Sequence, residues 1–291
     1  MSISVETAAE WAAEDTTISK VVAKLTELRA TEGAPLRTAV LTHIAWVPPE
    51  WTEAALDTLA GMHERHPSRA ILLLSDPDAG SDGIDAEVAL RCFELHGLGR
   101  SVGAEVITLR LRGDRSFAPA SVVWPLVIPD LPVFLRWRGR PAFGEEPLEQ
   151  MVDFVHRLIV DSTEWPDLPG AYSELAEIFD RTAVSDIAWS RTSRWRAQLA
   201  SLWPGIGEAR RIRVQGTLAQ AWLLAGWLRS RLGREIELEH EPSDRLVGVH
   251  VDGEPAPFPP GDAPPPSDLL SEQLDQFGRD PVYEAAVRSA P

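Results

Sequence analysis

The chain has 291 residues, 44% of them apolar, and its 44 acidic and 28 basic residues give a formal net charge of −16. This length and apolar fraction can bury a sizeable core and favour two domains over one, which excludes a disordered chain. The negative charge argues against general binding to nucleic acid or to an anionic membrane surface. We therefore expect a partner that is a protein or a small molecule.

Two rare residue types narrow the class further. The lysines, Lys20 and Lys24, both fall in the first predicted helix, which excludes a Schiff-base or P-loop lysine elsewhere. The single cysteine, Cys92, cannot form an internal disulfide, and the start of the chain lacks the pattern of a signal peptide. Since no apolar run reaches membrane-spanning length, we expect a cytoplasmic protein.

The first quarter of the chain predicts a β-α-β unit. After a polar lead-in, apolar residues at helical spacing over 18–28 indicate an amphipathic helix. Loose alternation over 37–47 predicts a strand, and Pro48 opens a second helix. A continuous apolar run over 70–74 is typical of a strand that is covered on both faces.

The next hundred residues add strands to the same predicted sheet. We expect an antiparallel strand over 86–96 and another strand over 104–112. A crossover helix over 119–128, with Pro119 in its first turn, leads into a strand over 131–137. A short helix near 146–151 and a last strand over 155–160 complete an N-terminal, mixed-sheet α/β domain over residues 1–162.

The remaining residues predict a second, smaller α/β domain over 163–254. Its helices are expected over 172–181 and 186–203, the latter with Asp186 as its N-cap. A strand, a buried helix and two further strands form a β-α-β-β pattern, expected over 210–215, 217–231, 235–239 and 246–251. Residues 255–291 read as a Pro-rich linker and a terminal helix, in an acidic segment that suits a solvated or docking tail.

Arginine and tryptophan gather in two segments. In the first, Arg136, Trp137, Arg138 and Arg140 end the strand over 131–137, and in the second Arg191 and Arg194 share one helix face. One interpretation is a buried strand with solvated arginines. The other is a partner-binding surface, since Arg and Trp are enriched in interface hot spots. We also hypothesise that the two segments converge across the domain junction.

A candidate anion site follows the second predicted helix. His66, Ser68 and Arg69 flank a proline-fixed turn that could present them to an anion, although helix capping and solvation explain the same residues. The sequence contains no Walker motif or GxSxG elbow, and His63 and His66 lack metalloprotease spacing. We therefore assign no catalytic, metal or cofactor residues.

Several unusual motifs carry a family resemblance. In chain order they are HPSR at 66–69, WPLVIPDLPVFLRWRG at 124–139, RLIVDS at 157–162 and DIAWSRTSRWRAQLASLW at 186–203. Together they resemble the glucose-6-phosphate dehydrogenase assembly proteins known as OpcA. This resemblance implies a non-enzymatic bacterial protein that promotes assembly or activity of glucose-6-phosphate dehydrogenase and so supports NADPH production by the oxidative pentose phosphate pathway. The lone Cys92 would rule out an intramolecular disulfide switch.

Two other classes of function remain open. A regulatory protein for sugar phosphates would use His66, Ser68 and Arg69 as an anion clasp, and a sugar-phosphate effector would stabilise it against heat. A hydrolase or transferase would need a constellation assembled across both domains, and turnover by the purified chain alone would reveal it.

Overall fold

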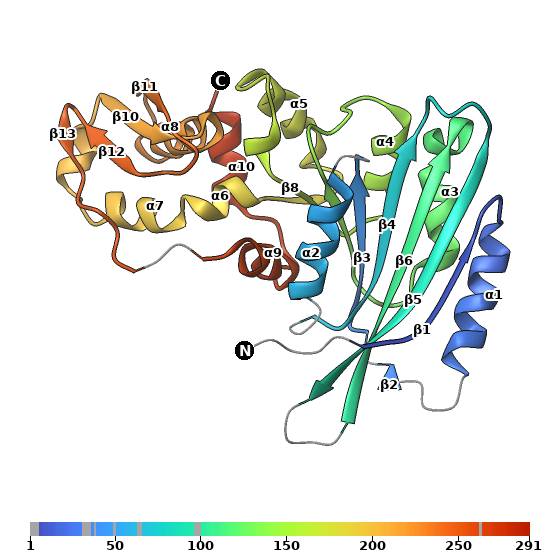
Figure 1. Cartoon of the computed structure of the whole chain (residues 1–291). Coiled ribbons are helices and arrows are strands. Elements are labelled where there is room, and N and C mark those ends of the chain that lie inside the picture. Colours follow the sequence, from blue (N-terminus) through green and yellow to red (C-terminus); the bar gives the residue numbers. More distant parts are fainter. Residues whose placement is uncertain are drawn as a thin grey trace. The chain divides into compact units, whose positions relative to one another are not determined.

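A computed structural model describes residues 6–30, 36–37, 39–48, 51–62, 66–95, 100–261 and 264–291. The chain forms two compact units, Met1–Leu158 and Ile159–Pro291, and each is described by itself. Both units combine helices with a sheet, which confirms the α/β class (Figure 1). Among the described residues, no helix combines the length and the apolar character needed to cross a bilayer.

A mixed sheet forms the body of the first unit. Its strand order is β1-β5-β6-β4-β3-β7, and β2 pairs with β6. The strands are β1 (Glu6–Ala13), β2 (Leu36–Arg37), β3 (Leu41–Val47), β4 (Ser68–Asp76), β5 (Gly83–Leu95), β6 (Arg100–Arg112) and β7 (Val133–Trp137). The helices are α1 (Ile18–Arg29), α2 (Thr52–Met62), α3 (Pro119–Val123) and α4 (Glu146–Val152).

The centre of this sheet is parallel and buried. Strands β3, β4, β6 and β7 run parallel, whereas β5 pairs antiparallel with β1 and β6. All seven residues of β3 are buried, and Ala70, Ile71, Leu72 and Leu73 of β4 are 0% exposed. The predicted β3-α2-β4 unit is therefore confirmed, because continuous apolar strands are stable where both faces are covered. The long strands β4, β5 and β6 lie side by side (Figure 1).

Two local predictions in the first unit need correction. The lead-in before α1 contains β1, an edge strand of the sheet that its polar and small side chains did not indicate. The helix expected over 119–128 is α helix only to Val123, and a 3-10 turn follows over Trp124–Leu126. Pro125 explains the change, because it has no N–H to continue the α-helical hydrogen bonds.

The second unit contains a separate four-stranded sheet in the order β11-β10-β12-β13. Its strands are β10 (Arg211–Gly216), β11 (Glu237–Pro242), β12 (Gly248–Val251) and β13 (Glu254–Pro255). Strand β9 (Ala183–Asp186) lies beside β8 (Arg157–Val160), within which the boundary between the units falls. The helices are α5 (Gly170–Ile178), α6 (Ile187–Arg191), α7 (Ser193–Ala200), α8 (Leu218–Leu232), α9 (Pro266–Leu274) and α10 (Pro281–Arg288).

Helix α8 begins and ends close to the positions that the sequence predicts. Thr217 caps its start, and the side chains of Thr217 and Gln220 each bind the other's backbone N–H in a capping box. Gly233 ends it with φ 64°, a left-handed conformation that glycine adopts at little cost. Strands β10 and β11, which α8 connects, are parallel, and β12 pairs antiparallel with β10, so the predicted β-α-β-β pattern is confirmed.

Helices α5 and α9 lie close to the predicted positions, but two other predictions for this unit need correction. The helix predicted over 186–203 is divided into α6 and α7 at Thr192, whose hydroxyl donates to the carbonyl of Trp189 at 2.7 Å. Of the two alternatives for the C-terminal segment, a solvated or a docking tail, the structure shows a segment that packs on its own unit. Helix α10 packs against α8 and α5, and its Tyr283 and Val287 are 0% exposed. The last residues therefore complete the core of the second unit.

Candidate functional site

The first Arg/Trp segment lies where β3 and β7 end. These strands are neighbours, yet the chain leaves β3 toward β4 on one side and leaves β7 toward β8 on the other. Such a reversal at the carboxyl ends of parallel strands is where open α/β sheets commonly bind ligands. The location therefore favours a binding surface over a buried strand whose arginines are merely solvated.

Two residues of this segment are enclosed. Arg136 and Trp137 are 5% and 3% exposed. The indole of Trp137 stacks on that of Trp46 in β3, with ring centroids 4.7 Å apart, and Arg136 donates to the carbonyl of Trp137 at 2.5 Å. Side chains this buried offer little area to a partner, so their role would be to hold the end of β7 in place.

The following two arginines are more accessible. Arg138 and Arg140 are both half-buried. The guanidinium of Arg138 lies over the ring of Trp51 at 4.5 Å, and that of Arg140 lies 5.2 Å from the centroid of Phe143. Cation–π contacts keep each arginine ordered while leaving part of it at the surface.

The predicted anion clasp lies inside the first unit. His66, Ser68 and Arg69 are 8%, 0% and 5% exposed. Arg69 donates to Glu105 at 2.7 Å, and Glu105 accepts a second bond from Arg29 at 2.5 Å. Burial alone would raise the pKa of Glu105, but these guanidinium groups outweigh it and lower that pKa. An internal carboxylate thus compensates Arg69, and its anion-binding role stays a prediction.

The second Arg/Trp segment lies on α6 and α7 in the second unit. Arg191 donates to both carboxylate oxygens of Asp161, at 2.9 and 2.8 Å. Arg194 binds the Pro-rich segment instead, through the carbonyl oxygens of Pro259, Pro260 and Gly261. These six predicted partner-binding residues are therefore divided between the two units, and their convergence stays a hypothesis.

Sequence reasoning missed a buried polar network beside Arg191. Asp186 accepts hydrogen bonds from the backbone N–H of Ser162 at 3.0 Å and of Ala188 at 2.8 Å, and from the hydroxyl of Ser162 at 2.5 Å. The Ser162 hydroxyl also contacts the phenol of Tyr172 at 2.9 Å. Burial, followed by repulsion from Asp161, raises the pKa of Asp186 to about 6. The motifs RLIVDS at 157–162 and DIAW at 186–189, which contain Ser162 and Asp186, were the available signal.

This raised pKa predicts a distinct pH dependence of stability. A carboxyl whose pKa is higher in the folded state favours folding while protonated, so its contribution is present at low pH and lost as the pH rises from about 4 to about 6. The full loss is roughly 3 kcal/mol, at about 1.4 kcal/mol per pKa unit. The difference in unfolding free energy between Asp186→Asn and the original chain should therefore shift in favour of the variant as the pH rises over this range.

Urea unfolding at a series of pH values measures the effect. Asp244→Asn is the control, because this carboxylate is exposed and has no described partner. A stability difference between Asp186→Asn and the original chain that does not change with pH would contradict the prediction.

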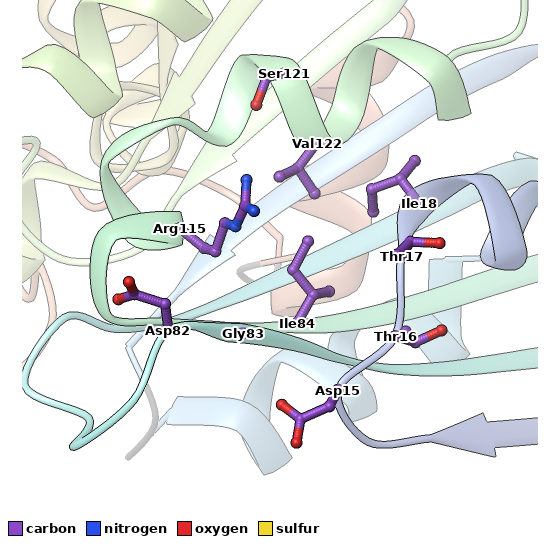
Figure 2. A pocket seen from close by; sticks show the side chains of 10 residues that line it. All are labelled: Asp15, Thr16, Thr17, Ile18, Asp82, Gly83, Ile84, Arg115, Ser121 and Val122. Carbon is purple, nitrogen blue, oxygen red and sulfur yellow. The ribbon is translucent and has the colours of Figure 1, made fainter.

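The first unit also contains a pocket of about 370 Å³ (Figure 2). Its lining includes the charged side chains of Asp15, Asp82 and Arg115 and the apolar side chains of Ile18, Ile84 and Val122. Asp15 and Asp85 also bind the guanidinium of Arg112, which joins the end of β6 to β5. With two carboxylates against one guanidinium in its lining, this pocket is a poor site for an anion.

Comparisons with known proteins define the class. Residues 60–177 match the family described as the N-terminal domain of a glucose-6-phosphate dehydrogenase subunit, and residues 182–257 match its C-terminal domain. The two matches together span more than half of the chain and include residues of both units. The chain belongs to the OpcA family of glucose-6-phosphate dehydrogenase assembly proteins, which confirms the resemblance.

Curated relatives come from cyanobacteria and carry the name OxPP cycle protein OpcA. The protein of Synechocystis is 27% identical over 213 residues, which cover 69% of this chain and 44% of the relative. That of Synechococcus elongatus is 26% identical over 206 residues, which cover 62% and 46%, and that of Nostoc punctiforme is 27% identical over 180 residues, which cover 58% and 38%. The chain thus spans less than half the length of these relatives.

Proposed function

We propose that this protein binds glucose-6-phosphate dehydrogenase and promotes its assembly or activity without performing catalysis itself. The observation that carries the proposal is the match, in order, to both domains of the OpcA family. To activate the enzyme, the protein must bind its active state more tightly than its inactive state, because equal affinity for both states shifts nothing.

The accessible arginines of the first unit are the proposed contacts. Arg138 and Arg140 lie at the carboxyl ends of β3 and β7, each over an aromatic ring. Arginine is enriched in interface hot spots, which surrounding contacts shield from water. Arg136 and Trp137 would position them from inside the unit, and Arg191 and Arg194 would contribute a second surface.

The direct test uses glucose-6-phosphate dehydrogenase from the same organism. Its activity and its molecular mass in solution would be measured alone and with this protein added. We expect a stable complex and a gain in enzyme activity. Two folded proteins that form no complex and leave the activity unchanged would refute the proposal, and turnover by this chain alone would favour the hydrolase or transferase alternative.

Variants then test the proposed surface. Arg138→Ala combined with Arg140→Ala should raise the concentration needed for half-maximal activation by about thirtyfold or more, since the loss of even one interface hot spot costs roughly 2 kcal/mol or more. The matched control is Arg110→Ala with Arg115→Ala, because both arginines are exposed in the same unit and the charge change is identical. Equal activation by the two double variants would remove Arg138 and Arg140 from the interface.

A further inference from the structure

A pocket of about 800 Å³ lies in the second unit. Helices α6 and α7 provide one wall, through Arg191 and Arg194. Thr217 at the start of α8, the loop between β11 and β12, and the Pro-rich segment at Phe258 provide the rest. This volume is within the range of pockets that bind metabolites.

The pocket lining includes Thr217, at the position where α/β units commonly bind phosphate. Strand β10, helix α8 and the parallel strand β11 form a β-α-β unit, and Thr217 directly follows the carboxyl end of β10. The capping box of α8 occupies the N–H groups of Thr217 and Gln220, but the aligned peptide dipoles of this 15-residue helix still place partial positive charge at its start. An anion in the pocket would meet this end of the helix.

The charged side chains in the pocket lining also favour an anion. In a chain of net charge −16, the pocket is lined by Arg191, Arg194 and Arg245 against the single carboxylate of Asp244. Asp161 compensates the first of these arginines. Arg194, by contrast, binds only carbonyl oxygens among the described residues, and it does so through Nε and Nη2. Its positive charge therefore has no described carboxylate partner.

Arg245 is the third arginine of the pocket lining. It is exposed in the loop between β11 and β12, and no described residue forms an ion pair or hydrogen bond with it. Phe258, 67% exposed at the same pocket, offers an aromatic face to a sugar or a base. The arginines and the helix end would bind a phosphate, while the aromatic wall would bind the organic part.

We propose that this pocket binds the phosphate monoester of a small metabolite. A sugar phosphate and a mononucleotide both carry this chemistry, and the test below distinguishes them. The proposal does not depend on the enzyme-activator function, because binding is measured with this chain alone. It also differs from the predicted clasp at His66, Ser68 and Arg69, where Glu105 already neutralises the arginine.

Isothermal titration calorimetry with the full chain provides the test. The probes are glucose 6-phosphate and adenosine monophosphate, each with its unphosphorylated counterpart, glucose and adenosine. We expect at least one phosphorylated probe to bind and its counterpart not to bind. Saturation by one probe alone would identify whether the organic part is a sugar or a nucleoside.

Variants locate the binding site. Arg245→Ala should weaken binding by about tenfold or more, the loss expected for one charge-assisted hydrogen bond. Arg231→Ala is the matched control, because it removes an exposed arginine of the same unit that does not line the pocket. Thermal melting would confirm that both variants are folded.

Three results would overturn the proposal. They are no heat from either phosphorylated probe at millimolar concentration, equal binding of the unphosphorylated counterparts, or equal losses in the two variants. The last result would show that general electrostatic attraction, and not this pocket, attracts the phosphate.

Discussion

Replacing Gly226 by alanine should destabilise the second unit by about 3 kcal/mol, the upper part of the range for overpacked cores. In a helix interior, alanine normally gains about 1 kcal/mol over glycine. Here a Cβ would lie well inside van der Waals contact with the carbonyl oxygen of Ala286 and 3.0 Å from the backbone nitrogen of Ala290. These are backbone atoms of α10 and of the residues that follow it, so a side-chain rotation cannot relieve the clash.

The neighbouring contacts make separation of the two helices costly. Arg229, one turn further along α8, donates to the carbonyl oxygens of Ser289 at 3.1 Å and of Ala290 at 2.6 Å. Moving α10 away from Gly226 would stretch these bonds and expose Tyr283 and Val287, which are 0% exposed. The clash is therefore expected to lower the free energy of unfolding.

Urea unfolding of Gly226→Ala measures this loss, with Gly233→Ala as its control. The second change meets no atom within 4 Å, but φ is 64° there, so we expect only the cost of about 1 kcal/mol of a left-handed alanine. A Gly226→Ala chain as stable as the original would mean that α10 does not pack on α8 as described.

Replacing Glu105 by glutamine should cost about 3–5 kcal/mol, the usual loss when one member of a buried ion pair is removed. Glu105 is 5% exposed and binds Arg69, also 5% exposed, together with Arg29. Glutamine fits the same space but carries no charge, so two guanidinium groups would remain without their carboxylate. The buried guanidinium of Arg69 would then lose the negative charge that offsets part of its desolvation cost.

The pH dependence of this contribution has the opposite sign to that of Asp186. The pKa of Glu105 is lowered in the folded chain, so its stabilisation is present above its ordinary pKa and is lost as the pH falls through the folded value. Unfolding measurements on Glu105→Gln should therefore show the largest deficit at neutral pH and a smaller one in acid. An equal deficit for Glu87→Gln, an exposed residue of β5, would show that burial of the pair is not the cause.

The sequence by itself determined elements whose signals are local. The buried run of β4 and the capping box and final glycine of α8 depend on residues close together in the chain. The motifs WPLVIPDLPVFLRWRG and DIAWSRTSRWRAQLASLW likewise carried the family before any fold was known. Periodicity, capping and turn chemistry act over a few residues, so a single sequence displays them.

Only the tertiary structure decided which charged residues are compensated inside the fold. Arg69 and Glu105 are 36 positions apart, and Arg191 and Asp161 are 30 positions apart. The edge strand β1 exists because β5, far along the chain, supplies its hydrogen-bond partners, and α10 becomes core because Gly226 lets it approach α8. Burial and ion pairing depend on partners that folding brings together, and local sequence patterns do not contain that information.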